Sequence, residues 1–379
     1  MLLAPLASPG PRDVLRALRA AVLGAGPAVA LGGDPATLPV EVPAGTAVVL
    51  TTSGSTGVPK SVVLGRHAFT ASALATAARS GDGAWLLALP ATYVAGVQVL
   101  VRALIAGHEP AVLGGSFTPQ AFAAATHGLA ASRGGTPVPR YTSLVPTQLA
   151  TLLDADDPRV DAALAAYEAI LVGGQAAPAA LLDRASARGA RIVRTYGSTE
   201  TSGGCVYDGV PLDGVGMRVA DGEVQLSGPT LAEGYLDAAL TASAFVTDGG
   251  VRWYRTGDAG EVADGALRVT GRLDNVIVSG GVNVSLDRVE RAVHTVPGLE
   301  HAVVVPIDDE RWGQASAVVA AVAAVTDPDA ALAAARTAVA AELGAPARPA
   351  RLIPVAAIPR LPNGKPDRRA ARALARSAG

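Results

Sequence analysis

The most informative stretch of this chain reads Thr51-Thr52-Ser53-Gly54-Ser55-Thr56-Gly57-Val58-Pro59-Lys60, a run of hydroxyls and glycines that ends in a lysine. It follows Thr46 to Leu50, a β-branched run after Gly45 that predicts a buried strand. Glycines let successive N–H groups converge on an anion, hydroxyls add donors, and the ammonium supplies a point charge. The stretch therefore predicts a binding loop for a polyphosphate.

The Walker P-loop is one known loop of this kind, and the stretch departs from it at one position. Counting from Gly54, the Walker pattern requires a glycine just before the lysine, and Pro59 stands there. Proline has no N–H to offer a phosphate and fixes φ, so a nucleotide switch or motor is not expected. Taken alone, the stretch also leaves open a Ser/Gly-rich surface turn.

Length and composition indicate a soluble globular chain. Its 379 residues suggest roughly two domains of ~100–200 residues each. The 31 Lys and Arg residues nearly balance 33 Asp and Glu residues, so no nucleic-acid partner is expected. Prolines at 5, 9 and 11 interrupt the apolar N-terminus, which argues against membrane insertion. Cys205 is the single cysteine and cannot form an internal disulfide, which fits a cytoplasmic protein.

Apolar periodicity alternates between strand and helix as far as about residue 200. The predicted strands are 84–89, 111–113, 141–145, 169–172 and 191–194, and the predicted helices are 11–23, 68–78, 94–105, 119–131 and 147–153. This alternation predicts βαβ units and a largely parallel sheet. In such open sheets ligands bind at the carboxyl ends of the strands.

From about Val210 the pattern changes to short strands and glycine-rich turns, which predicts a small β subdomain. Beyond Gly271–Asp274 it becomes a mixed α+β pattern of about a hundred residues. We therefore expect an α/β fold in two domains. Residues 1–273 form a large N-terminal domain with mostly parallel sheets and the small β subdomain, and residues 274–379 form a small mobile α+β C-terminal domain.

The order hydroxyl-Ser-Gly-Ser-Thr-Gly-x-Pro-Lys resembles the phosphate-binding loop of the adenylate-forming superfamily, which includes acyl-CoA synthetases, luciferases and peptide-synthetase adenylation domains. Further motifs of this superfamily follow in family order along nearly the whole chain. Each motif is weak alone, and their order is specific. The resemblance implies that ATP phosphates are bound by Thr52, Ser53, Gly54, Ser55, Thr56, Gly57 and Lys60.

Residues 196–200, Tyr-Gly-Ser-Thr-Glu, resemble a second loop of the superfamily. In the family the aromatic residue stacks on adenine, the threonine contacts phosphate and the glutamate positions Mg²⁺. These roles are implied for Tyr196, Thr199 and Glu200, with Gly197 in the same loop. Mg²⁺ is a hard cation that proteins hold with few carboxylates plus substrate phosphates. Taken alone, this motif is equally compatible with a polar turn.

Two further motifs resemble nucleotide contacts of the superfamily. Gly173, Gly174 and Gln175 resemble its glycine-rich adenine edge, where missing side chains permit close approach of a planar ring. Asp258 resembles the aspartate that accepts hydrogen bonds from both ribose hydroxyls. An ordinary strand-to-helix turn and an exposed Arg–Asp pair are the respective alternatives.

The C-terminal motifs resemble a hinge and a second catalytic surface. Arg272 is implied to reach the nucleotide, and Asp274 to absorb the rotation between domains. Gly280 and Gly281 resemble the loop that lines the pantetheine tunnel of coenzyme A, where a thiol arm must pass the backbone closely. Lys365 resembles the lysine that contacts the carboxylate and α-phosphate during adenylation. Taken alone, its Pro-Asn-Gly-Lys sequence is a good β-turn.

Within the superfamily, Pro59–Leu64, Ser143–Leu149 and the final lysine motif resemble the o-succinylbenzoate–CoA ligases of menaquinone biosynthesis, in their compact actinobacterial form. The resemblance implies an AMP-forming ligase that uses ATP, Mg²⁺ and coenzyme A, with a homodimer as one conceivable assembly. The second carboxylate of such an acid needs a cation or hydroxyls when buried, and Arg140 is a candidate. Tyr93 departs from the family because it occupies the place of a histidine that often gates the acyl site.

Other functions are also compatible with these motifs. They are a CoA ligase for another aryl or medium-chain acid, an adenylation domain that loads a carrier protein, and a non-catalytic nucleotide-binding protein. No carrier attachment motif follows Lys365, and the presence of Glu200, Asp258 and Lys365 argues for catalysis. The five histidines show no metal-ligand spacing.

Overall fold

The computed structural model describes residues 1–379 except 53–58, 311, 362–364 and 378–379. The predicted phosphate-loop residues Ser53, Gly54, Ser55, Thr56 and Gly57 therefore lie outside the described residues. The chain divides into two compact units. Unit 1 comprises Met1–Arg218, Gln225–Thr256 and Ala263–Leu267, and unit 2 comprises Val219–Val224, Gly257–Val262 and Arg268–Gly379.

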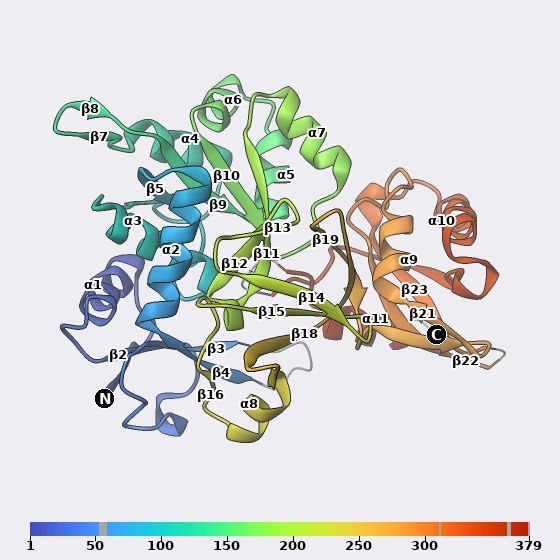
Figure 1. Cartoon of the computed structure of the whole chain (residues 1–379). Helices are drawn as coiled ribbons and strands as arrows, with labels where there is room; N and C mark the ends of the chain where they lie inside the picture. The colour runs from blue at the N-terminus through green and yellow to red at the C-terminus, as the bar shows by residue number, and fades with distance from the viewer. Residues whose placement is uncertain (53–58, 311, 362–364, 378–379) are drawn as a thin grey trace. The chain divides into compact units, whose positions relative to one another are not determined.

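Unit 1 contains a seven-stranded sheet with the order β13-β12-β11-β10-β9-β5-β6 (Figure 1). Its strands are β5 (Ala84–Leu87), β6 (Ala111–Val112), β9 (Arg140–Leu144), β10 (Ala169–Gly173), β11 (Ile192–Ser198), β12 (Gly203–Tyr207) and β13 (Val210–Pro211). The neighbours from β11 to β6 pair in parallel, whereas β12 and β13 are antiparallel. The predicted largely parallel sheet is confirmed.

Helices cover both faces of this sheet. Successive residues of each strand point to opposite faces, so apolar side chains are buried on both sides. The face that carries Leu86, Leu144 and Ile170 is buried by α4 (Pro119–Gly128), α5 (Pro146–Asp154), α6 (Pro158–Ala165) and α7 (Ala179–Ala187). The other face packs against α2 (Arg66–Ser80) and α3 (Val94–Ala106), and α1 (Pro11–Val22) lies against α3 (Figure 1). There the Arg102 guanidinium lies 5.3 Å from the centroid of the Trp85 ring.

A second sheet of unit 1 has the order β1-β2-β3-β4-β16. Its strands are β1 (Leu3–Pro5), β2 (Ala28–Leu31), β3 (Thr46–Thr52), β4 (Lys60–Gly65) and β16 (Gly234–Tyr235). β3 and β4 are antiparallel, with Thr52 opposite Lys60. The predicted phosphate loop therefore connects two antiparallel strands, whereas a Walker loop runs from a strand into a helix.

The small β region predicted after Val210 forms a third sheet with the order β14-β15-β18-β17, in which β19 also pairs with β18. Its strands are β14 (Gly216–Ala220), β15 (Glu223–Ser227), β17 (Phe245–Asp248), β18 (Val251–Ala263) and β19 (Ala266–Arg272). Smaller elements of the chain up to this point are β7 (Ser132–Arg133), β8 (Thr136–Pro137), α8 (Ala238–Ala244) and the short 3₁₀ turns η1 (Pro35–Thr37) and η2 (Thr199–Thr201).

The C-terminal part of unit 2 is an α+β layer structure, as predicted. Its strands are β20 (Val276–Ser279), β21 (Val282–Ser285), β22 (Val303–Asp309), β23 (Gly313–Ala321) and β24 (Arg351–Val355). One face packs on α9 (Leu286–Val293) and α10 (Pro328–Leu343), and the other on α11 (Arg368–Ser377). The 3₁₀ turns η3 (Val322–Ala324) and η4 (Ala345–Ala347) complete it. Gly344 ends α10 with φ 84°.

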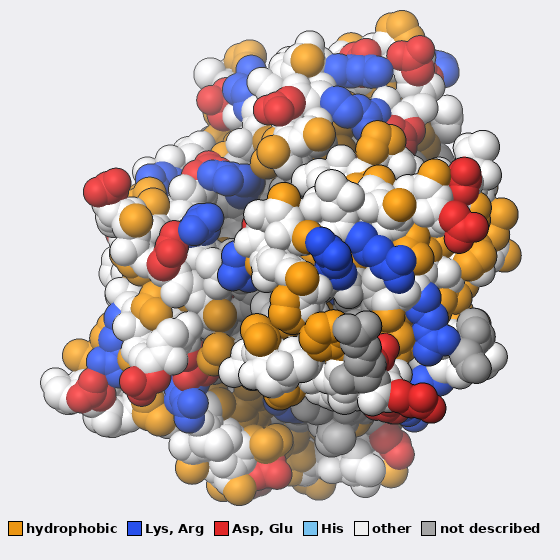
Figure 2. Space-filling view, turned by 90° about the vertical axis from the view of Figure 1, so that its right-hand side faces the viewer, with side chains coloured by type: hydrophobic (Ala, Val, Ile, Leu, Met, Phe, Trp, Pro, Cys, Tyr) orange, Lys and Arg blue, Asp and Glu red, His pale blue; other side chains and the backbone are white. Residues whose placement is uncertain are grey.

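Arginine is concentrated near the C-terminus, with seven between positions 348 and 376. Figure 2 shows many basic side chains on the face that it views, next to acidic and apolar ones. Because charges of both signs are mixed on this face, a role for any one basic residue must be argued from its own contacts. Among the described residues, none of the helices has both the length and the hydropathy that a membrane span requires.

Gly96 fixes the approach of α3 to the loop that follows β5. A Cβ at this position would lie 2.1 Å from the Pro90 carbonyl oxygen. We expect Gly96→Ala to destabilise the protein by about 1–3 kcal/mol, because the backbone must move to relieve the contact. Gly114→Ala is the matched control, since a Cβ there meets nothing within 4 Å. Urea unfolding of both variants measures the difference, and equal midpoints would contradict this account.

Candidate active site

The phosphate-loop strands bring Thr52 and Lys60 face to face at their open end. The preceding pair is tied by a 2.8 Å hydrogen bond between the Thr51 and Ser61 hydroxyls. The Lys60 ammonium lies 5.9 Å from the centroid of the Tyr235 ring, at a distance suited to a cation–π contact. Lys60 is thus held at the edge of the loop that the sequence predicts to bind phosphates.

Glu200 lies next to Tyr235, a residue that the sequence analysis missed. The Tyr235 hydroxyl donates a 2.7 Å hydrogen bond to Oε1 of Glu200. Burial, with the Glu200 charge, raises the pKa of Tyr235 above its ordinary value. Burial and the same carboxylate also raise the pKa of Tyr254. Both phenols are therefore neutral near pH 7, and Tyr235 is a hydrogen-bond donor to the Glu200 side chain.

The surroundings of Glu200 suit a cation that is shared with phosphates. Among the described residues, no group of three or more His, Cys, Asp and Glu side chains could hold a metal alone. One carboxylate, oriented by a phenol, matches the sparse protein ligation that Mg²⁺ accepts when phosphates supply the other oxygens. The Cys205 thiol is no alternative ligand, because it is buried and burial raises its pKa to about 12.

The turn that carries Thr199 and Glu200 is held by α3. It ends at Ser202, which is fully buried and has φ 55°, a left-handed conformation that is uncommon for a residue with a side chain. Gln98 of α3 donates through Nε2 to the Ser202 carbonyl oxygen. The Thr201 hydroxyl accepts from the Ser198 N–H at 2.8 Å. Gln98 is a second residue that the sequence analysis missed, because no motif contains it.

The predicted adenine edge lies at the carboxyl ends of β10 and β11. Gly173 pairs with Thr195, and a Cβ on Gly173 would lie 2.3 Å from the Thr195 hydroxyl oxygen. The neighbouring strand is therefore itself a reason for glycine here. Gly174 and Gln175 follow β10 directly, and Tyr196 and Gly197 lie in β11. The parallel register brings these predicted residues to one edge of the sheet, as expected.

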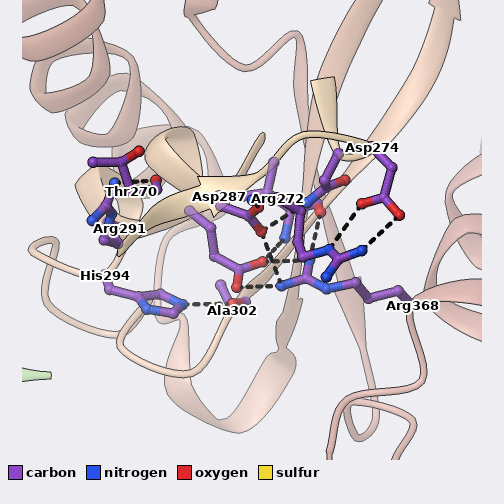
Figure 3. A network of polar contacts seen from close by, with 11 residues as sticks. Thr270, Arg272, Asp274, Asp287, Arg291, His294, Ala302 and Arg368 are labelled. Atoms are coloured by element: carbon purple, nitrogen blue, oxygen red, sulfur yellow. Dashed lines mark hydrogen bonds and ion pairs between the residues drawn. The ribbon is translucent and has the colours of Figure 1, made fainter. Parts of the chain in front are cut away.

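In unit 2, Arg272 contacts two of the predicted residues. Its Nη1 donates to Asp258 Oδ1 at 3.0 Å, and its Nε and Nη2 donate to the two oxygens of Asp274, each at 3.0 Å. Figure 3 shows Arg272 beside Asp274 in this network. The Gly257 N–H donates to Glu223 Oε1 at 2.9 Å, which fixes the backbone next to Asp258.

Lys365 and the two loop glycines also belong to unit 2. The Lys365 carbonyl accepts from the Leu361 N–H at 2.8 Å. Desolvation lowers the pKa of the Lys365 ammonium, and the charge of Asp258 opposes this shift. Gly280 and Gly281 form the turn between β20 and β21 with φ 57° and 82°. A Cβ on Gly280 would lie 2.4 Å from the Trp312 ring, whereas one on Gly281 would meet nothing within 4 Å.

The structure does not support Arg140 as the acid-binding cation. Arg140 is the first residue of β9, so it lies at the amino end of a strand whose parallel partner β10 ends in Gly173. The other predicted residues of this sheet lie at its carboxyl edge, four or five residues away at ~3.3 Å each. Tyr93 precedes α3 as its N-cap, on the carboxyl side of β5, and its gating role stays a prediction.

Comparisons with known proteins agree with this arrangement. A family model described as AMP-binding enzyme matches residues 16–236, more than half of the chain. The chain belongs to the AMP-binding enzyme family. A second model, the AMP-binding enzyme C-terminal domain, matches residues 288–365, which includes Lys365.

Similar proteins include several succinylbenzoate ligases. The chain is 44% identical over 331 residues to a "Probable 2-succinylbenzoate--CoA ligase" of Mycobacterium tuberculosis, covering 86% of this chain and 83% of that protein. It is 36% identical to the 2-succinylbenzoate–CoA ligase of Salmonella typhimurium over 274 residues, which are 69% of this chain and 55% of that protein.

Solved structures of the family share the fold. A variant of Escherichia coli MenE with bound OSB-AMS has a TM-score of 0.73 at 27% identity and covers 93% of this chain and 77% of that one. The o-succinylbenzoate CoA synthetase of Bacillus subtilis, in complex with the acyl-adenylate intermediate OSB-AMP, has a TM-score of 0.73. At 22% identity, with 98% of this chain and 83% of that one covered, the second likeness concerns the fold alone.

The Tyr235–Glu200 hydrogen bond can be tested through ATP binding. Hydrogen bonds to charged groups contribute ~1.5–3 kcal/mol, so we expect Tyr235→Phe to weaken ATP binding in the presence of Mg²⁺ by roughly ten- to a hundredfold. The control is Tyr167→Phe, which removes a buried hydroxyl bonded to Thr126 at 2.7 Å. That variant loses stability and keeps its ATP affinity. Calorimetric titration measures both, and an unchanged affinity in Tyr235→Phe would exclude the role.

Proposed function

We propose that this member of the AMP-binding enzyme family converts 2-succinylbenzoate (o-succinylbenzoate), ATP and coenzyme A into the acyl-CoA thioester, AMP and pyrophosphate. The observation that carries the proposal is the 44% identity with the Mycobacterium tuberculosis protein over 83% of that protein's length. This activity would place the chain in menaquinone biosynthesis. Cytoplasmic location, expected from the sequence, and a homodimer, named above as one conceivable assembly, stay predictions.

In the first half-reaction a carboxylate oxygen of the acid attacks the α-phosphorus of ATP, and pyrophosphate leaves with the electron pair of the broken P–O bond. Thr52 and Lys60, with Ser53–Gly57, bind the leaving phosphates. Glu200, oriented by Tyr235, would hold a Mg²⁺ ion whose positive charge would stabilise the phosphates, and Thr199 contacts phosphate. Gly173, Gly174, Gln175, Tyr196 and Gly197 surround the adenine, and Asp258 and Arg272 bind the ribose side of the nucleotide.

Lys365 carries the charge stabilisation of this step. Its ammonium contacts the carboxylate and the α-phosphate while negative charge builds up between them. Groups in such preorganised electrostatic roles typically contribute ~10²–10³ in rate. Lys365 acts as a point charge, so it must be protonated while the phosphoryl group is transferred.

In the second half-reaction the coenzyme A thiol attacks the carbonyl carbon of the acyl-adenylate and loses its proton, and AMP leaves. This step gains nothing from Lys365, because the phosphate already departs as part of a stable monoester. Gly280 and Gly281 line the pantetheine path. Residues 274–379 rotate about Asp274 between the two steps, so the domain boundary after Leu273 belongs to this proposal.

The substrate assignment is tested by ATP–pyrophosphate exchange across a panel of acids. We expect exchange with 2-succinylbenzoate to exceed that with benzoate and octanoate. If benzoate or octanoate supports faster exchange, the chain is a ligase for another acid. If no acid supports exchange while ATP still binds, the non-catalytic alternative is correct.

The division of labour is tested with Lys365→Ala in the two half-reactions. We expect roughly 10²–10³-fold slower adenylation, because a preorganised charge is lost. Preformed succinylbenzoyl-adenylate plus coenzyme A should still give thioester at a nearly normal rate. Replacement of Gly281, where a side chain has room but the φ of 82° disfavours one, should slow the thioester step alone. Equal losses in both steps would contradict a rotating site.

The lowered pKa of Lys365 predicts a pH dependence. Only the protonated lysine stabilises the transferring charge, so the adenylation rate falls as pH rises through its pKa. Desolvation places this fall below the ordinary lysine value of 10.5. Single-turnover adenylation between pH 7 and 10 measures the midpoint. Lys365→Arg is the control, because arginine stays charged throughout this range, and an identical alkaline fall in that variant would assign it to another group.

A further inference from the structure

Arg368 is set apart from the other C-terminal arginines by its contacts. Its Nη2 donates to Glu290 Oε1 at 2.7 Å, and its Nη1 donates to Glu290 Oε2 at 2.8 Å and to the Val304 carbonyl oxygen at 3.1 Å. Two parallel bonds to one carboxylate fix a guanidinium in direction as well as in distance. Glu290 also accepts from the Val304 N–H at 2.8 Å, so the carboxylate is itself held.

We call this paired contact of Arg368 with Glu290 the clasp. Arg368 lies three residues after Lys365. Between the two, the Pro366 backbone bridges to Arg360, and the Asp367 N–H donates to the Pro359 carbonyl oxygen at 2.8 Å. Asp367 Oδ1 then accepts from the Ala370 N–H at 3.0 Å, at the beginning of α11. The backbone that follows Lys365 is therefore held in place at Arg368. Because three residues span at most ~10 Å, this contact restricts where Lys365 can lie.

The same turn of α9 also holds the predicted hinge. Asp287 lies three residues before Glu290, on the same face of the helix. It accepts from the Arg272 N–H at 2.6 Å and from the Asn275 side-chain amide at 2.8 Å, and its Oδ1 lies 3.9 Å from Arg368 Nη2. Figure 3 shows Arg272, Asp287 and Arg368 in one network. The hinge segment and the lysine segment are thus attached to one rigid helix.

We propose that Arg368 is a positioning residue for adenylation: clasped by Glu290, it fixes Lys365 relative to the Arg272–Asp274 hinge, so that rotation delivers the lysine in one defined position. The inference rests on the proposed function. Arg368 does not touch the reacting groups, and it acts through Lys365. A misplacement of about 1 Å at a reacting centre can cost on the order of a hundredfold in rate, which is the size of effect that the clasp can control.

A purely structural role predicts something different. The Arg368 side chain is 41% exposed and that of Glu290 only 14%, so a purely structural pair, once broken, lowers stability and slows both half-reactions alike. Arg288, on the same α9, forms a more exposed pair with Glu342 of α10, with side chains 46% and 49% exposed and 3.6 Å between charged atoms. Within the described part of the chain, Arg288 and Glu342 form no ion pair with residues 360–368, so Arg288→Gln is the control.

The test compares both half-reactions in Arg368→Gln, Arg368→Lys and Arg288→Gln. We expect Arg368→Gln to slow adenylation by roughly ten- to a hundredfold, with the loss in kcat rather than in the KM for ATP. Thioester formation from preformed acyl-adenylate should stay near wild type, which also shows that the variant is folded. Arg368→Lys keeps the charge without the paired geometry and should lose less, and Arg288→Gln should lose nothing in either step.

A double variant separates positioning from general damage. If Arg368 acts only through the lysine, adding Arg368→Gln to Lys365→Ala lowers adenylation no further. A further loss in the double variant, equal losses in both half-reactions, or an unaffected Arg368→Gln would each overturn the inference while wild type remains active. A wild-type chain without adenylation activity on any acid would instead refute the proposed function.

Discussion

The parallel pairing of β9, β10 and β11 aligns the carboxyl ends of these strands, where the predicted adenine-binding residues of unit 1 lie. Gly173 lies opposite Thr195 with no room for a side chain between the strands. The backbone register of the two strands therefore positions the loops that follow them. The turn that carries Glu200 directly follows the carboxyl end of β11. Tyr235 reaches it from β16, which pairs with the phosphate-loop strand β4. The hydrogen bond from Tyr235 to Glu200 thereby links the seven-stranded sheet to the sheet that carries the predicted phosphate loop.

The two units handle charge in different ways. Around Glu200, burial raises the pKa values of Tyr235 and Tyr254, so both phenols stay protonated, and Tyr235 donates a hydrogen bond to the Glu200 side chain. In unit 2, Arg272 is bonded to Asp258 and Asp274 together. The first arrangement is suited to binding a charged ligand in place, and the second to changing partners when a ligand or a rotation alters the balance.

Local features of this chain could be predicted from sequence, and contacts between distant segments could not. Strands such as Ala169–Gly173 and helices such as Val94–Ala106 follow from apolar spacing. Tyr235 and Gln98 were missed because neither lies in a motif, and each acts through a partner more than thirty residues away. The suggestion of Arg140 was avoidable, because a residue that precedes a predicted strand lies at its amino end, away from the ligand edge.

The rotation proposed for residues 274–379 needs contacts that can break, and the exposure of the ion pairs at the predicted hinge meets this need. The side chains of Arg272 and Asp274 are 36% and 49% exposed, so water screens their attraction and replaces their hydrogen bonds when they separate. Asp258 is less exposed, at 17%, and remains the more costly carboxylate to leave without a partner. In the proposed function, the ribose hydroxyls donate to Asp258, which compensates that loss and frees Arg272 for other contacts. The nucleotide itself can therefore weaken the hinge contacts, without a buried ion pair that would hold the domain in one orientation.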